Sequence, residues 1–179
     1  MAALSLSDSI IRESALGDSR AIESLYPQAF PDENLLPLVR DLLKDESVTT
    51  SLVGVVDTEV AAHIIFTKCS VTGSNVNAAL LGPLAVAPKW QRQGIGSALV
   101  RFGLRRLEDE GVSLVCVLGD PAYYERLGFL PESLILPPYR LPTEWEGAWQ
   151  SQVVGDRSVS SSGELSVPRQ WQVPELWAP

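Results

Sequence analysis

Residues that bind metals or form disulfides are scarce in this chain. Its 179 residues include one histidine, His63, and two cysteines, Cys69 and Cys116. One histidine and two cysteines are too few for a convincing zinc site, so we expect no metal. Both cysteines lie in apolar, strand-like segments, and we expect reduced, buried thiols rather than a disulfide or a nucleophile.

An excess of positive charge is also missing. The chain has 14 lysines and arginines against 22 aspartates and glutamates, which gives a formal net charge of −8. Proteins that bind nucleic acids present a basic surface, so we expect no nucleic-acid partner. The acidic balance weakly favours a cationic or amine-bearing substrate, and a solvated acidic surface is the plainer explanation.

The chain contains no long hydrophobic run. The most apolar window, residues 78–88, is too short to span a bilayer and is interrupted by Pro83. Residues 1–10 lack a basic region followed by a long apolar stretch, so we expect no signal peptide. These absences favour a cytoplasmic protein without a membrane partner.

The composition is that of one globular domain. An apolar content of 45% and a charged content of 20% are ordinary, and the length suits a single domain, 1–179. Strands are expected at 8–13, 48–56, 60–69, 76–86, 112–118, 149–154 and near Leu165. Four helices are expected: one that starts after Asp18, and others at 32–45, 96–110 and 120–128. Asp18 would cap the first of these helices, and Asp120 would cap the last. Strands outnumber helices and a hairpin comes early, which predicts a mixed α/β or α+β domain around one central sheet.

A glycine-rich turn separates an apolar, strand-like segment from a helical one. Glycine permits positive φ and a close approach of the backbone to a ligand. At the start of a helix, uncovered N–H groups and the helix dipole suit a phosphate. Side chains in the turn add further donors, so a pyrophosphate fits it; the turn consists of Gln91, Arg92, Gln93, Gly94, Ile95, Gly96 and Ser97.

Two common phosphate-binding motifs do not match this turn. A P-loop needs Gly-Lys-Ser/Thr, and no lysine follows here. The dinucleotide fingerprint needs glycine or alanine where this chain has Leu99. The remaining pattern, Gln/Arg-x-x-Gly-x-Gly/Ala, is matched in full by residues 91–96, and it resembles the pyrophosphate loop of the GNAT acetyltransferase superfamily. A turn that merely joins strand to helix is the other interpretation.

The neighbouring segments strengthen the resemblance, which is closest over residues 80–129. Residues 82–88, Gly-Pro-Leu-Ala-Val-Ala-Pro, look like the family's splayed strand. Residues 122–129, Ala-Tyr-Tyr-Glu-Arg-Leu-Gly-Phe, resemble its aromatic-Tyr-x-x-x-Gly-Phe segment. The sequence of residues 118–124, Leu-Gly-Asp-Pro-Ala-Tyr-Tyr, is similar to sequences of a bacterial subfamily of small predicted N-acetyltransferases. Residues 130–179 would form a C-terminal strand and a proline-rich tail.

The resemblance implies a fold and a reaction. The fold is a single GNAT-like domain with a central mixed, mostly antiparallel sheet, a splayed middle strand and flanking helices. The reaction is an N-acetyl transfer from acetyl-CoA, the co-substrate, to a primary amine of a small molecule or peptide by direct attack. Backbone groups of Leu84, Ala85 and Val86 would pair with the pantetheine arm, and residues 91–97 would hold the pyrophosphate. A homodimer is compatible with this family.

Two side chains are candidates for proton transfer. By the resemblance, Tyr124 would protonate the leaving thiolate; the alternatives are a packed aromatic ring at this position, or Tyr123 as the acid. Many family members use a glutamate of the splayed strand as base, but residues 82–85 contain no carboxylate. His63, on a neighbouring predicted strand, is suited to proton transfer near pH 7. It could equally be a structural residue held by hydrogen bonds. In that case a chain of water molecules would carry the proton to solvent, or the amine would arrive neutral, and no protein base would be needed.

The missing carboxylate leaves a second function open. A non-catalytic domain with the same fold could bind acyl-CoA as a sensor. Release of free thiol in the presence of amines would distinguish an enzyme from such a sensor.

Overall fold

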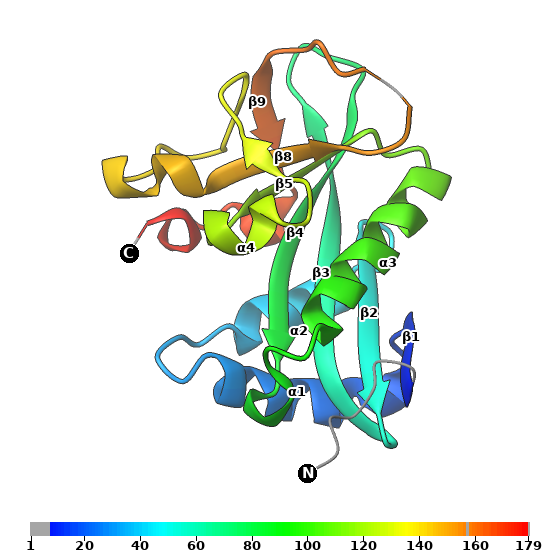
Figure 1. Cartoon of the computed structure of the whole chain (residues 1–179). Coiled ribbons are helices and arrows are strands. Elements are labelled where there is room, and N and C mark those ends of the chain that lie inside the picture. The colour runs from blue at the N-terminus through cyan, green and yellow to red at the C-terminus, as the bar shows by residue number, and fades with distance from the viewer. Residues whose placement is uncertain (1–7, 157, 179) are drawn as a thin grey trace. The chain divides into compact units, whose positions relative to one another are not determined.

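The computed structural model describes residues 8–156 and 158–178, and the chain divides into two compact units. Unit 1 comprises Met1–Ile65 and Pro83–Gly103, and unit 2 comprises Phe66–Gly82 and Leu104–Pro179. Three elements run through both units; they are β3 (Glu59–Val71), β4 (Asn77–Val86) and α3 (Ile95–Asp109) (Figure 1).

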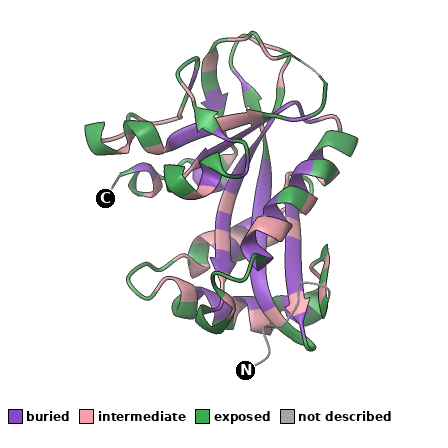
Figure 2. Ribbon diagram, viewed as in Figure 1, coloured by how far each residue is buried: buried purple, intermediate pink, exposed green. Residues whose placement is uncertain are grey.

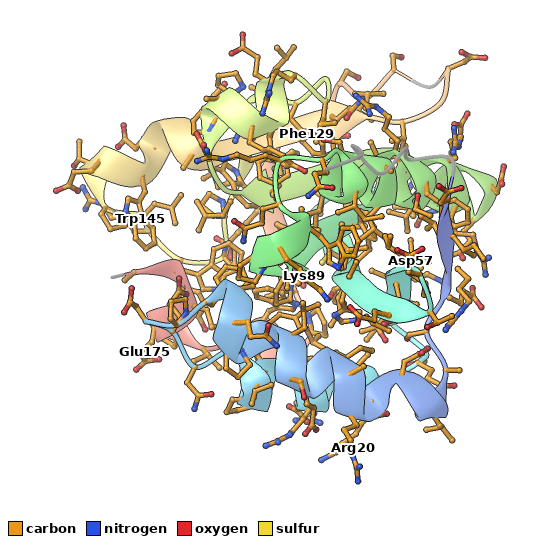
Figure 3. All side chains as sticks on the ribbon, turned by 60° about the horizontal axis from the view of Figure 1, so that its bottom comes forward. Arg20, Asp57, Lys89, Phe129, Trp145 and Glu175 are labelled. Atoms are coloured by element: carbon orange, nitrogen blue, oxygen red, sulfur yellow. The ribbon has the colours of Figure 1, made fainter. Side chains whose placement is uncertain are left out.

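Unit 1 begins with an antiparallel strand pair. β1 (Ser9–Glu13) pairs with β2 (Thr49–Val56), and the strands follow the order β1-β2-β3-β4. The turn between β2 and β3 places Asp57 and Thr58 at φ values of 47° and 70°, and Asp57 is labelled in Figure 3. Two consecutive residues with positive φ match the right-handed twist of a hairpin. The predicted first strand and hairpin are therefore confirmed.

Helices cover both faces of β3 in unit 1. The side chains of Ala62 and His63 point to opposite faces because they are successive residues of a strand. The ring of His63 meets Tyr26 of α1 (Ser19–Ala29) edge to face, with centroids 5.6 Å apart. On the other face, Gly54 lies beside both Ala62 and Ile95, the first residue of α3. Helix α1 and the start of α3 thus lie on opposite faces of the sheet (Figure 1).

Unit 2 contains the rest of the sheet. Its strands follow the order β3-β4-β5-β8-β6, with β9 pairing both β3 and β7. The β4–β5 and β7–β9 pairs are parallel, and the β3–β9, β5–β8 and β6–β8 pairs are antiparallel. The further elements are β5 (Leu114–Leu118), α4 (Pro121–Glu125), β6 (Leu130–Pro131), β7 (Ile135–Leu136), β8 (Trp149–Val153) and β9 (Gly163–Ser166).

A tryptophan cluster fixes the C-terminal tail of unit 2. Two 3₁₀ helices, Arg169–Trp171 and Pro174–Trp177, carry two of these rings, and β8 carries the third. The Trp177 centroid lies 6.1 Å from that of Trp171 and 5.9 Å from that of Trp149. All three side chains are buried, so the two tryptophans of the tail, Trp171 and Trp177, anchor it to unit 2. Figure 2 shows that buried residues also dominate β3 and β5.

The helix that the sequence predicts at 32–45 is shorter in the structure and starts later. Helix α2 (Leu36–Leu43) holds Pro37 in its first turn, where proline costs no hydrogen bond. Three further 3₁₀ helices within residues 8–156 and 158–178 are short: Leu16–Asp18, Pro88–Trp90 and Thr143–Ala148. Among the residues that the structure describes, no helix has the length and apolar character needed to cross a membrane.

Both predicted caps, Asp18 and Asp120, stand at the N-cap position of their helices, but only Asp120 makes a side-chain capping bond. The carboxylate of Asp18 makes no capping bond to α1, because it accepts two hydrogen bonds from Arg12 and one from the Ala15 amide. Asp120 does cap α4, accepting a hydrogen bond from the Ala122 amide at 3.0 Å. Both cysteines are free thiols, as predicted; Cys116 is buried as expected, whereas Cys69 is only half-buried.

The contact at Gly54 generates a stability prediction. A Cβ atom at Gly54 would lie 2.9 Å from Cδ1 and 3.0 Å from Cγ1 of Ile95, so Gly54→Ala must displace the side chain of Ile95 at the start of α3. Overpacking of this kind typically costs about 1–3 kcal/mol. We expect a loss of that size in the free energy of unfolding, measured by urea titration.

Gly17→Ala is the matched control for this substitution. No heavy atom lies within 4 Å of a Cβ built at Gly17, so its free energy of unfolding should change by less than about 0.5 kcal/mol. Equal stabilities of the two variants would contradict a tight contact between β2 and α3.

Candidate active site

The loop of residues 91–97 follows β4 in unit 1 and leads into α3. Two of its side chains tie the loop to the preceding backbone. Gln91 Nε2 donates to the carbonyl oxygen of Val86 at 3.1 Å, and Gln93 Nε2 donates to that of Lys89 at 2.9 Å. These carboxamides therefore shape the loop, and the main chain becomes the principal source of donors for a bound anion.

The backbone of the loop turns sharply into the helix. Arg92 and Gly94 have positive φ, 60° and 87°, at this turn. A hydrogen bond at this end of α3 runs from the Ala98 amide to the Gly94 carbonyl oxygen at 3.0 Å. The amides of Ile95 and Gly96 precede it, at the positive end of the helix dipole. This arrangement suits a phosphate or pyrophosphate.

Positive side chains lie next to the loop. Lys89, labelled in Figure 3, forms an ion pair with Glu59, and its ammonium group lies 5.5 Å from the centroid of the Trp90 ring. The side chain of Arg92 is exposed. Because exposed charges move freely and are screened by salt, they add attraction for an anion without fixing its position.

The middle of β4 is irregular where the sequence predicts it. β4 pairs with β5 over Ala78–Leu81, and the next residue, Gly82, has a φ of 145°. Pro83 then carries no amide hydrogen, so it cannot donate to a neighbouring strand. Beyond it, Ala85 is fully buried whereas Leu84 and Val86 are half-buried, which is the alternation of a strand with one covered face.

Tyr124 lies in α4, the short helix that follows β5 in unit 2. Its ring meets those of Tyr123 and Phe129 edge to face, with centroids 5.0 Å and 5.5 Å away, and Phe129 is labelled in Figure 3. A Cβ atom at Gly119 would overlap the Tyr124 ring, so glycine is needed between β5 and α4. Burial raises the pKa of the Tyr124 hydroxyl above its ordinary value of 10, which keeps it protonated at neutral pH.

His63 is the centre of a hydrogen-bond chain in unit 1. Its Nδ1 lies 2.7 Å from the hydroxyl oxygen of Tyr26, and its Nε2 lies 2.8 Å from that of Ser51. Ser51 in turn accepts a hydrogen bond from Ser14 at 2.6 Å. The chain crosses β2 and β3 and links the end of β1 to α1. Both ring nitrogens of His63 are therefore occupied by protein groups.

The environment of His63 disfavours its charged form. The side chain has no exposed surface, and this burial lowers its pKa from 6.5 to about 3, although the Asp18 carboxylate acts weakly in the opposite direction. At neutral pH the imidazole is therefore uncharged. As a base it would be much weaker than a histidine in water.

The predicted site residues fall in both units. Unit 1 contains His63, residues 84–86 and the loop 91–97, and unit 2 contains Tyr124. The sequence analysis did not identify the partners Tyr26 and Ser51, which no local motif marks. Among residues 8–156 and 158–178, no group of three or more His, Cys, Asp or Glu side chains is placed to hold a metal ion.

A family model and two curated relatives match this chain. The model of the acetyltransferase (GNAT) family matches residues 19–129, a span that contains the loop, the irregular part of β4 and Tyr124. The Escherichia coli K12 protein "Uncharacterized N-acetyltransferase YjhQ" is 32% identical over 155 residues, which cover 83% of this chain and 86% of the relative. "Uncharacterized N-acetyltransferase YhbS" of the same strain is 35% identical over 113 residues, 63% of this chain and 68% of the relative.

Two solved structures resemble the whole chain. YhbS from Escherichia coli in complex with CoA aligns with a TM-score of 0.84 at 28% identity, covering 93% of each chain. A GNAT family acetyltransferase from Brucella melitensis in complex with acetyl-CoA aligns with a TM-score of 0.73 at 27% identity, covering 92% of this chain and 98% of that one.

The buried His63 generates a prediction for stability at acidic pH. Below pH 6.5 the unfolded chain binds a proton at His63 that the folded chain excludes until about pH 3. The free energy of unfolding should therefore fall as the pH is lowered through this window, by up to about 1.4 kcal/mol per pH unit. Urea titrations at several pH values measure this slope.

His63→Gln is the comparison that isolates the histidine, since all other titrating groups remain. The stability difference between wild type and variant should shrink steadily as the pH falls below 6.5. Parallel curves for the two proteins would show that His63 is not held neutral in the folded state.

Proposed function

We propose that this chain, which belongs to the acetyltransferase (GNAT) family and has the fold of its enzymes, transfers the acetyl group of acetyl-CoA to a primary amine by direct attack. The acceptor would be a small molecule or a peptide. The observation that carries the proposal is the loop 91–97, whose positive φ values at Arg92 and Gly94 turn the main chain into the start of α3. The complexes of similar enzymes with CoA and acetyl-CoA support it.

Each end of acetyl-CoA would meet a different part of the chain. The pyrophosphate would accept hydrogen bonds from the amides of the loop 91–97. The pantetheine arm would pair with backbone groups of Leu84, Ala85 and Val86 in the manner of an added strand. Amide groups at the irregular part of β4 would also polarise the thioester carbonyl while negative charge develops on its oxygen.

Tyr124 would donate a proton to the departing sulfur. The attacking amine forms the new C–N bond, the C–S bond breaks, and the amine loses one proton overall while the thiol gains one. Because burial raises the pKa of Tyr124, the hydroxyl is a weak acid and acts only as charge builds on the sulfur. We therefore expect its contribution at the lower end of the range that general acids show, about 10²-fold.

The role of His63 remains a choice between two proposals. As a base it would accept the proton of the amine directly, yet its depressed pKa makes it a poor acceptor from an alkylammonium group of pKa ~10.4. Its bonds to Tyr26 and Ser51 instead favour a structural role, with the amine arriving neutral or losing its proton to water. The turnover rate of His63→Gln separates these roles, since only a direct base would lower it about 10²-fold or more. The homodimer and the cytoplasmic location stay predictions from the sequence.

Coenzyme binding and thiol release test the function. We expect acetyl-CoA to bind in calorimetry and to release free thiol with members of an amine panel. Gly96→Glu places a carboxylate at the start of α3 and should weaken binding at least tenfold, or about 1.4 kcal/mol. A folded Gly96→Glu variant with unchanged affinity would contradict the pyrophosphate site. Binding without thiol release from any amine would favour the acyl-CoA sensor instead.

Tyr124→Phe tests the general acid. The variant keeps the ring that packs against Phe129, so folding and acetyl-CoA affinity should persist while the maximal rate falls about 10²-fold. Tyr123→Phe removes the neighbouring hydroxyl and should keep the wild-type rate. A rate lost only in Tyr123→Phe would show that the wrong tyrosine is assigned. If neither variant is slower while chemistry limits turnover, no tyrosine acts as the acid.

A further inference from the structure

The C-terminal tail of unit 2 lies close to the irregular part of β4. If Gly82 carried a Cβ atom, that atom would lie 3.7 Å from Cη2 of the Trp171 indole. Apart from the chain neighbours of Gly82, no other described residue places a heavy atom within 4 Å of that position. The indole edge is therefore the nearest group on this side of Gly82, although 89 residues separate the two in sequence.

Trp171 is itself held from two directions. Its indole Nε1 donates to the hydroxyl oxygen of Thr67, a fully buried residue of β3, at 3.0 Å. Its carbonyl oxygen accepts a hydrogen bond from Trp177 Nε1 at 3.0 Å, and the two rings lie edge to face. The ring is thus tied both to β3 and to the tail, and it cannot rotate without breaking a buried hydrogen bond.

Gly82 stands where β4 changes its pairing. The ladder to β5 includes Leu81, and the next two residues combine a φ of 145° with a proline. Glycine has the largest conformational freedom of any residue, and nothing in its own structure selects one backbone state. A group outside the strand can limit the conformations open to this part of β4, and the Trp171 indole is the described group that lies nearest on this side of Gly82.

We propose that Trp171 is a positioning residue that holds the bend of β4 at Gly82 in the conformation that the pantetheine arm requires. The inference rests on the proposed function, because the arm is assigned to the backbone of residues 84–86, immediately after the bend. A preorganised strand edge binds an extended ligand more tightly, because no conformational entropy is lost in ordering the strand. Trp171 acts on the ligand through Gly82 and Pro83, and it makes no contact with the reacting atoms.

A comparison of two ligands tests this role. CoA contains the pantetheine arm, whereas adenosine 3′,5′-bisphosphate lacks both the arm and the pyrophosphate and reports on the nucleotide end alone. Trp171→Phe shortens the ring and removes the bond to Thr67. We expect calorimetry to show at least a fivefold loss of affinity for CoA and a change of less than twofold for the bisphosphate.

Two further variants sharpen the test. Gly82→Ala disturbs the backbone of β4 directly, because alanine rarely adopts a φ of 145°. This variant should show the same selective loss of affinity for CoA. Trp149→Phe is the matched control: its indole is buried in the same cluster and donates to the Ile135 carbonyl oxygen, but it lies outside the contact shell of Gly82. It should leave both affinities within twofold while lowering the thermal midpoint of unfolding.

The outcomes are distinct. Selective loss of CoA affinity in Trp171→Phe and Gly82→Ala, but not in Trp149→Phe, supports the inference. Unchanged CoA affinity in a folded Trp171→Phe variant, or equal losses for both ligands, overturns it. A wild-type protein that binds neither CoA nor acetyl-CoA would overturn the proposed function itself, and the inference with it.

Discussion

The interruption of β4 at Gly82 and Pro83 is the constraint on which the candidate site depends. A regular strand would satisfy its amides and carbonyls through its neighbours and offer nothing to a ligand. Here a φ of 145° and a residue without an amide hydrogen end that regularity in the middle of the strand. The pairing with β5 covers Ala78–Leu81, so under the proposed function the backbone of residues 84–86 would serve an extended ligand, and the loop 91–97 follows a few residues later.

The packing at the start of α3 and within the loop 91–97 explains why the loop can be so small. Ile95 begins α3 and presses against Gly54 of β2, so the helix starts at a defined point over the sheet. The carboxamides of Gln91 and Gln93 then fold the loop back on its own carbonyls. The proposed anion site would therefore consist of main-chain groups held by side chains, which is why we expect glycines to matter there more than charges.

Local signals made most of these features predictable from the sequence. The glycine turn, the Asp120 cap and the Gly82-Pro83 interruption each occupy only a few consecutive residues, and the mixed, mostly antiparallel sheet with flanking helices is confirmed. The contacts of Thr67 with Trp171 and of His63 with Tyr26 join segments 104 and 37 residues apart. No periodicity or spacing encodes such pairs. Strands β6 and β7 were missed because two residues are too few to show alternation.

The hydrogen-bond chain through His63 also couples its members. A neutral imidazole has one nitrogen that donates and one that accepts, so the hydroxyls of Tyr26 and Ser51 must take opposite roles toward the ring. When Ser51 donates to Nε2, Nδ1 donates to the oxygen of Tyr26, and the other tautomer exchanges both roles. The orientation of a hydroxyl on α1 is in this way linked to that of a hydroxyl on β2.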